Sequence, residues 1–159
     1  MALALVFPII FHAFGLGSAF LPMFYPIISA GFLIALPVAL VVGVMSPLVS
    51  MLVTGMPPFF PPIGLVMMVE GAVLTALPAL LYPKLKRNAW YTAIITMAVD
   101  RVVMLLLTLL FSRLLKLPEG VMGAAALFNG IPGTLLILLL IPPLVKQLES
   151  KTRLARMID

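Results

Sequence analysis

The stretch "AIITMAVDRVVMLLL" (residues 93–107) decides the class of fold, because it is an apolar run of helix length that holds one acid and one base, Asp100 and Arg101. It lies within a longer apolar segment, residues 90–112, and a helix of about 20 such residues crosses a bilayer. The whole chain has this character, since 64% of its 159 residues are hydrophobic and only 9% are charged. A soluble domain of this size needs far more polar surface. The sequence therefore predicts an all-α integral membrane protein.

Composition also limits the classes of function. The net charge is +5, but the Lys and Arg residues lie in short segments between and after the apolar runs, which argues against a nucleic-acid surface. The absence of Cys excludes disulfides and thiolate metal sites. The chain has no HExxH, GxSxG or P-loop motif. We therefore expect no enzyme, no cofactor, no metal and no intrinsic coupling to ATP.

Six apolar segments predict six membrane helices in a single transmembrane domain, residues 1–159. The connection "TGMPPFFPPIG" (residues 54–64) has four prolines in six positions and cannot continue a helix. The apolar run from Ile27 to Thr54 is interrupted by Pro37, where we expect a break between two helices. The expected helices cover residues 2–14, 24–36, 38–54, 63–82, 90–112 and 121–145.

The distribution of basic residues predicts the orientation. With six helices, the loop at residues 84–87 and the tail after residue 145 share one side, which holds seven of the nine Lys and Arg residues outside the spans. The positive-inside rule then places both termini in the cytoplasm. The two loops rich in Pro and Gly, residues 15–26 and 55–62, are therefore predicted to face outside.

Three polar residues inside the expected helices fall at similar depths below the outer surface. The rise of about 1.5 Å per residue places Glu70 roughly 10 Å deep, Asn129 roughly 12 Å and Arg101 roughly 16 Å. A charge near the bilayer centre costs about 2.5–3.5 kcal/mol, so such residues usually face protein or a wet cavity. We interpret the three residues as one polar pocket that opens to the outside. The alternative, weighted equally, is that Glu70 and Arg101 only pair to hold two helices together.

Two further ionisable residues have no assigned role. Successive residues of a helix are about 100° apart, so Asp100 and Arg101 are predicted to point in different directions rather than pair. His12 is expected to be a core or interface histidine rather than a metal ligand, because the sequence offers no nearby co-ligands.

Methionine and small residues suggest how the helices pack. Some methionines lie near the predicted outer loops and are candidates for lining an adaptable apolar pocket, although core packing is the default; these are Met23, Met56, Met67 and Met68. Pairs of small residues four positions apart allow close helix approach, chiefly for internal packing. They are Ala39/Gly43, Ala72/Ala76 and Ala126/Gly130.

Several segments resemble, in order and spacing, the S components of energy-coupling factor (ECF) vitamin transporters. The segment at residues 20–58, "FLPMFYPIISAGFLIALPVALVVGVMSPLVSMLVTGMPP", is similar to their second and third helices, which typically carry "LPMH-P-LLAG" and then "GL-SPL-S-LLTGMPP". "MMVEG" leading into "ALLYPK" (residues 67–84) resembles their fourth helix, "AFE…GLLYK". "YTAIITMAVDRVV" (residues 91–103) resembles the fifth, which often has an Arg at the position of Arg101, and "ALFNGIPGTLLILLLIPPLV" (residues 126–145) the sixth.

The resemblance implies a bundle of six transmembrane helices in a prokaryotic plasma membrane that captures a vitamin from outside at high affinity. It further implies two kinds of protein partner, a membrane T component and two cytoplasmic ATPases that drive release inward. Two features depart from the family pattern. Only Ala2 and Ala4 remain of an alanine-rich face on the first helix, and Phe24 and Tyr25 stand where relatives often have His, which suggests aromatic stacking on the ligand.

In the family, the outer loops and the outward halves of helices four to six form the binding site. Carried onto this sequence, the expected substrate-binding residues are Glu70, Arg101, Asn129, Phe24, Tyr25 and Met67. The expected gating loops include Pro22, Met56, Pro57 and Phe59.

The identity of the substrate stays open between three vitamins. Pantothenate comes first, because Arg101 suits a carboxylate and Glu70 or Asn129 suits a hydroxyl or amide. Cobalamin and riboflavin share much of the sequence pattern. Two other functions are also open, a structural or assembly subunit of a membrane complex and a self-sufficient proton-coupled carrier that uses Asp100 as its proton site.

Overall fold

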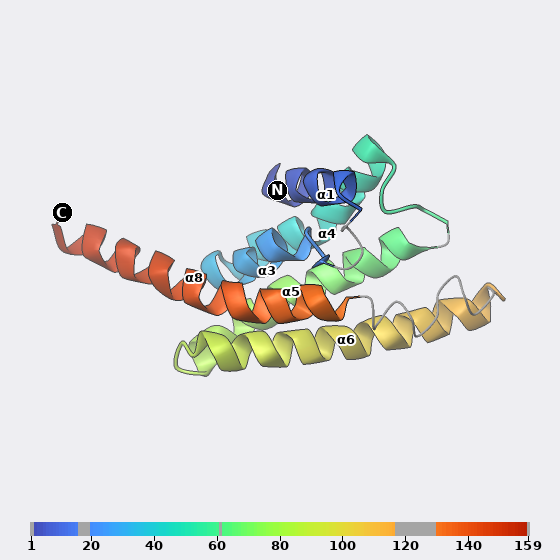
Figure 1. Ribbon diagram of the computed structural model, residues 1–159. Coiled ribbons are helices and arrows are strands. Elements are labelled where there is room, and N and C mark those ends of the chain that lie inside the picture. The colour runs from blue at the N-terminus through green and yellow to red at the C-terminus, as the bar shows by residue number, and fades with distance from the viewer. Residues whose placement is uncertain (1, 16–19, 61, 117–129, 159) are drawn as a thin grey trace.

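The computed structural model describes residues 2–15, 20–60, 62–116 and 130–158, and the regular structure in these ranges is entirely helical (Figure 1). The helices are α1 (Ala2–Ala13), α3 (Phe24–Leu33), α4 (Leu36–Thr54), α5 (Ile63–Lys84), α6 (Ala89–Leu114) and α8 (Ile131–Ile158). Four of them are long and apolar enough to cross a membrane: α4, α5, α6 and the part of α8 up to Lys151. The prediction of an all-α protein is confirmed, and the four helices are those of a multi-pass membrane protein.

The first two helices are shorter than a full span. α1 has 12 residues and α3 has 10, which at the rise of an α-helix corresponds to about 18 Å and about 15 Å. The hydrocarbon core of a bilayer is about 30 Å thick. The expectation of six complete spans therefore stays a prediction for these two helices.

The break between α3 and α4 lies at Ile34 and Ala35, slightly ahead of the expected position at Pro37. Pro37 sits in the first turn of α4, after the N-cap residue Ala35. A proline in the first turn of a helix sacrifices no hydrogen bond, because the N–H groups there have no partner within the helix. Pro37 thus starts the second helix rather than separating the two.

α8 continues well beyond residue 145, where we expected the membrane helix to give way to a tail. It runs to Ile158, and its C-terminal part projects beyond the rest of the bundle in Figure 1. The segment "KQLESKTRLARM" (residues 146–157) consists largely of strong helix formers, so the helix propagates although its residues are charged. The expected start of this helix, residues 121–129, lies outside the described part of the chain.

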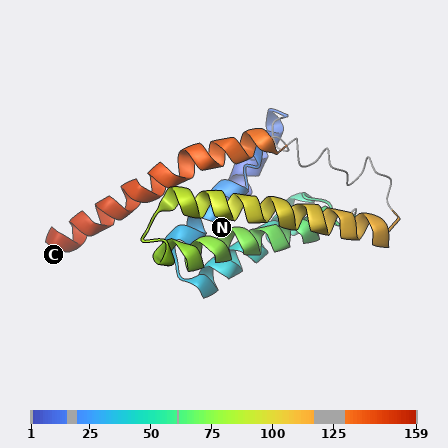
Figure 2. The same ribbon diagram turned by 90° about the horizontal axis from the view of Figure 1, so that it is seen from below.

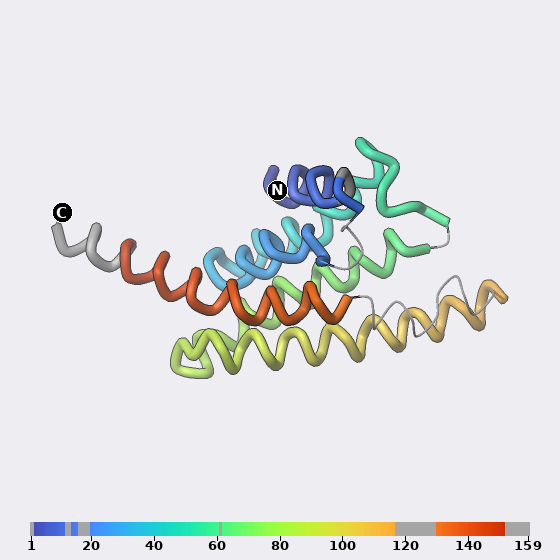
Figure 3. Tube along the Cα trace, in the orientation of Figure 1, coloured from blue at the N-terminus to red at the C-terminus, as the bar shows by residue number. Residues whose placement is uncertain are grey.

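α5 is the helix around which the others are arranged. It packs against α3, α4 and α6, while α8 packs against α6 and α3. Figure 2, which views the molecule from below, shows α6 and the first half of α8 along the same side of the bundle. α1 lies against α3 and α4, on the side away from α6 (Figure 3).

The contact between α4 and α5 is made by backbone against backbone at two glycines. A Cβ atom at Gly43 would overlap the Gly71 carbonyl, and a Cβ atom at Gly71 would overlap the Gly43 carbonyl. α3 approaches α5 in a similar way, since a Cβ at Gly31 would lie 2.6 Å from the carbonyl oxygen of Thr75. Small residues allow this close approach of helices.

These contacts match only part of the expected small-residue pattern. Ala39 is fully buried on the same helix as Gly43, as the first pair requires. On α5 the close approach is made at Gly71, whereas Ala72 and Ala76 are half-buried. The third pair includes Ala126, which lies outside the described residues.

The two basic segments meet at one end of the bundle. Arg87, in the turn after α5, pairs with Glu149 of α8, with 2.9 Å between Nη1 and Oε1. Tyr82 donates a hydrogen bond of 2.8 Å from its hydroxyl to Oε2 of the same carboxylate. The loop at residues 84–87 and the part of α8 around Glu149 therefore lie side by side, which agrees with the same-side arrangement predicted from the charges. Which side faces the cytoplasm stays a prediction.

Replacing Gly43 with Ala tests the backbone contact between α4 and α5. We expect Gly43→Ala to lower the free energy of unfolding by about 1–3 kcal/mol, the usual cost of overpacking, because the new methyl group meets a backbone carbonyl. The matched control is Val41→Ile, which also adds one carbon but at an exposed position of α4 and should change stability by less than about 0.5 kcal/mol. Unfolding of the purified protein in detergent measures both, and equal stabilities would contradict the assigned contact.

Candidate functional site

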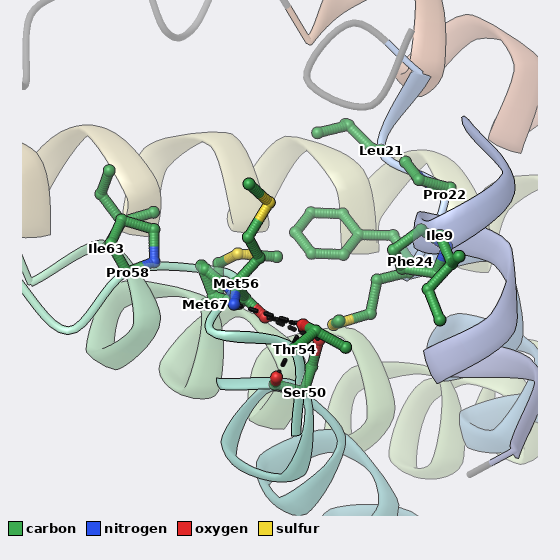
Figure 4. Close-up of a pocket in the computed structure, with 13 residues that line it drawn as sticks. Ile9, Leu21, Pro22, Phe24, Ser50, Thr54, Met56, Pro58, Ile63 and Met67 are labelled. Atoms are coloured by element: carbon green, nitrogen blue, oxygen red, sulfur yellow. Dashed lines mark hydrogen bonds between the residues drawn. The ribbon is translucent and has the colours of Figure 1, made fainter. Parts of the chain in front are cut away.

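A cavity of about 520 Å³ lies at the end of the bundle opposite the Arg87–Glu149 pair, where α4 ends and α5 begins. Its walls come from α1, the turn before α3, the end of α4, the connection at residues 55–62 and the first turns of α5 (Figure 4). Thirteen residues line it: Pro8, Ile9, Leu21, Pro22, Met23, Phe24, Ser50, Thr54, Met56, Pro57, Pro58, Ile63 and Met67. Its volume lies within the usual range of small-molecule sites, about 300–1,000 Å³.

The connection after α4 is shaped by a left-handed glycine and two hydroxyl groups. Gly55 ends α4 with φ 72°, a conformation that favours glycine. The Ser50 hydroxyl donates to the Met56 carbonyl at 2.7 Å, and the Thr54 hydroxyl donates to the Ser50 carbonyl at 2.8 Å. The Thr54 oxygen also accepts from the Met56 amide at 3.2 Å. These bonds hold Met56 against the end of α4, beside the cavity.

The side chains that a ligand in the cavity would contact are almost all apolar. Ser50 and Thr54 are its only polar lining side chains among the described residues, and their hydroxyls already donate to the protein's own backbone. The remaining lining residues are aliphatic, aromatic, Pro or Met. In Figure 4 the Phe24 ring is turned toward Met56 and Met67, which come from two different elements. Aromatic and thioether groups of this kind suit a flat apolar ring.

The turn that leads into α3 forms the opposite wall. Leu21 has φ 51°, and the Phe24 amide donates to its carbonyl at 2.9 Å. Met23 and Phe24 are both buried. This turn directs Leu21 and Pro22 to the cavity while it anchors the following two side chains in the bundle.

A buried charged cluster of Glu70, Asp100 and Arg101 lies next to the cavity. Arg101 donates from Nη2 and Nε to Asp100 Oδ2, at 2.6 and 3.2 Å, and its Nη2 lies 3.8 Å from Glu70 Oε1. The Asp100 side chain is completely buried, that of Glu70 is 5% exposed and that of Arg101 is 20% exposed. The cluster joins α5 to α6.

The expectation that Asp100 and Arg101 point apart is wrong. Their Cβ atoms do diverge around the helix, but the long Arg side chain turns back and places its guanidinium on the neighbouring carboxylate. A carboxylate buried without a partner is costly, and guanidinium is well suited to donate two hydrogen bonds to it. Backbone geometry alone does not predict contacts of so flexible a side chain.

The cluster and the cavity are separate but adjacent. Neither Glu70, Asp100 nor Arg101 lines the cavity, although Glu70 lies about one turn beyond Met67 on α5. On the other side, Leu21 Cδ1 and Arg101 Nη1 both lie within 3.3 Å of the point that a Cβ atom at Gly130 would occupy. Leu21, which lines the cavity, and the guanidinium therefore both lie next to Gly130.

The structure brings together some of the predicted site residues and not others. Phe24, Met67, Pro22, Met56 and Pro57 line the cavity, and so does Met23; Met68 does not. Tyr25 is half-buried and packs against the core, and Phe59 is 57% exposed, so neither lines the cavity. Asn129 and the side chain of His12 lie outside what the structure describes.

Sequence analysis did not identify some of the other residues that line the cavity. Pro8 and Ile9 belong to α1, and their place depends on how α1 crosses the end of the bundle. Ser50 and Thr54 are four residues apart just before Gly55, a spacing that puts both on one face of a helix end. That spacing is the one feature that could have identified them.

The described residues contain no group of three or more His, Cys, Asp or Glu side chains that could hold a metal ion. Comparison of the chain with protein-family models, curated proteins and solved structures finds no match. The resemblance to ECF S components therefore stays an expectation that rests on the quoted segments.

Removing the guanidinium tests the energetic importance of the buried cluster. We expect Arg101→Met to lower the free energy of unfolding by about 3–5 kcal/mol, because it leaves two buried carboxylates without their cation. The control is Arg87→Met, which removes a cation that is 57% exposed and should cost about 0–1 kcal/mol. Equal losses in detergent unfolding would show that the cluster is not a buried ionic contact.

Proposed function

We propose that this chain is the substrate-binding membrane subunit of a vitamin transporter of the ECF type. The observation that carries the proposal is the apolar cavity of about 520 Å³ at the bundle end opposite the basic segments. The two loops that sequence analysis places outside supply part of its lining, including Pro22 and Met56. A ligand that arrives from outside would meet this end of the protein first.

The lining narrows the chemistry of the ligand. With both lining hydroxyls bound to backbone, the cavity offers an apolar surface of Phe, Pro and Met side chains, which suits a flat ring system. Riboflavin, with its planar ring, fits this description better than pantothenate. Pantothenate would need Arg101 for its carboxylate, but Arg101 does not line the cavity and is held by Asp100. Cobalamin is much larger than a cavity of this size.

The proposed partners follow from the resemblance to ECF S components. A T component in the membrane and two cytoplasmic ATPases would supply the energy for release. The basic end of the bundle, with the turn after α5 next to α8, would face the cytoplasm of a prokaryotic cell and place both termini there. The first purification should therefore also test for a co-purifying T component.

A second function, that of a structural or assembly subunit, is favoured by one observation. Glu70 and Arg101 join α5 to α6, as they would if their only role were to hold the two helices together. A subunit of this kind binds no vitamin. The ligand experiments below separate it from the first proposal, and uptake into liposomes without any ATPase would instead identify a self-sufficient carrier.

Ligand binding is tested on protein purified without added vitamin. We expect mass spectrometry to find a co-purifying ring-containing vitamin, and the same compound to raise the midpoint of thermal unfolding. A panel of riboflavin, pantothenate and cobalamin ranks the candidates. The absence of both a bound compound and any thermal shift across the panel would favour the structural subunit.

Filling the cavity should weaken that binding. We expect Met67→Trp to weaken the affinity by about tenfold or more, which corresponds to about 1.4 kcal/mol, because the indole occupies the space of the ligand. The control is Leu65→Trp, which adds a comparable side chain at an exposed position of the same helix and should leave the affinity unchanged. Full binding by Met67→Trp would place the ligand outside this cavity.

A further inference from the structure

Three buried side-chain oxygen atoms of α5 and α6 have no hydrogen-bond partner within the described structure. They are Glu70 Oε1, Asp100 Oδ1 and Thr96 Oγ1. Thr96 and Asp100 are fully buried and lie one turn apart on the same face of α6. A buried polar atom without a partner is costly, so oxygens left in this state point to a group that binds them.

The charges of the cluster do not balance. Two carboxylates, Glu70 and Asp100, approach the same guanidinium nitrogen, Arg101 Nη2, at 3.8 and 2.6 Å. If both are ionised, the cluster has one negative charge in excess. Glu70 has the weaker contact, since 3.8 Å is beyond hydrogen-bond distance.

None of the other described helices that pack on α5 or α6 supplies the missing positive charge near the cluster. α3 and α4, which pack on α5, contain no Asp, Glu, Lys, Arg or His residue. The part of α8 before Lys146 contains none either, and the described Lys and Arg residues of the turn after α5 lie at the far end of the bundle. Among the described residues of these helices, Glu70, Asp100 and Arg101 are thus the only acidic or basic side chains in this part of the interior, and α3 adds the phenol of Tyr25.

We propose that Glu70, Asp100 and Thr96 form a binding site for one monovalent cation, a proton or a sodium ion, beside Arg101. A single positive charge would neutralise the cluster and partner its free oxygens. Ionisable residues within membrane helices commonly bind or conduct ions. The site does not depend on the proposed vitamin binding, and it would make the stability of the helix bundle sensitive to the cation.

The experiment measures the midpoint of thermal unfolding of the purified full chain in detergent. It compares choline chloride, potassium chloride and sodium chloride at equal ionic strength, and each salt from mildly acidic to mildly alkaline pH. A sodium site predicts a midpoint raised by at least about 3 °C in sodium chloride alone. A proton site predicts no preference for sodium and a fall of similar size toward alkaline pH, where the proton is lost from the folded protein.

Glu70→Gln is the main variant, because it keeps the shape of the side chain and removes its charge. We expect it to fold and to lose the dependence on sodium or pH. Glu149→Gln is the control, since it makes the same change at the end of the bundle and should keep that dependence.

Infrared spectroscopy of the wild-type protein gives a readout that does not rely on a variant. A proton site predicts the carbonyl stretch of a protonated carboxylic acid, shifted by deuterium oxide and absent from Glu70→Gln or Asp100→Asn. Equilibrium dialysis with radioactive sodium predicts one ion per chain for a sodium site. If the protein shows no such band, binds no sodium and unfolds independently of both cations, the cluster is a static ion pair and the proposal is wrong.

Discussion

The contact between the backbones of α4 and α5 at Gly43 and Gly71 is the constraint on which the rest of the structure depends. It brings the two helices closer than side chains would permit. Because the connection between them is short and rich in Pro, their adjacent ends then form two facing walls, Ser50 to Thr54 and Ile63 to Met67. α3 adds to this pair through Gly31, and its preceding turn completes the cavity. A looser contact would displace the walls and alter the cavity.

The chemistry of the cavity follows from how the chain satisfies its own polar groups. The connection after α4 leaves the Met56 backbone outside the helix, and two side chains bind it: the Ser50 hydroxyl donates to the Met56 carbonyl, and the Thr54 oxygen accepts from the Met56 amide. The same hydroxyls have then used their donor protons, so they could only accept hydrogen bonds from a ligand. The cavity is thus mainly apolar although Ser50 and Thr54 line it. The proposed flat, apolar ligand follows from the hydrogen bonds that these hydroxyls make to the backbone, and not from the residue types of the lining alone.

The buried charges show how far sequence could anticipate the candidate site. Their depth indicated that Glu70 and Arg101 face protein, and the structure does bring them within 3.8 Å. The role of Asp100 could not be predicted, because it depends on how the Arg101 side chain folds. The cavity residues from α1 could not be predicted either, since they depend on the path of a distant helix. Three of the four suspected methionines, Met23, Met56 and Met67, do line the cavity, whereas Met68 does not.

The sequence by itself determined the helical and apolar character of the chain, the Pro-rich connection between α4 and α5, and the two basic segments. These features arise from local causes, namely hydropathy, the missing N–H of proline and the left-handed conformation of Gly55. Only the tertiary structure decided that Gly71 rather than Ala72 meets α4, that Arg101 binds Asp100, and that the cavity is separate from the charges. Each of these outcomes depends on distances between segments far apart in the chain and on the conformations of flexible side chains, which no local pattern determines.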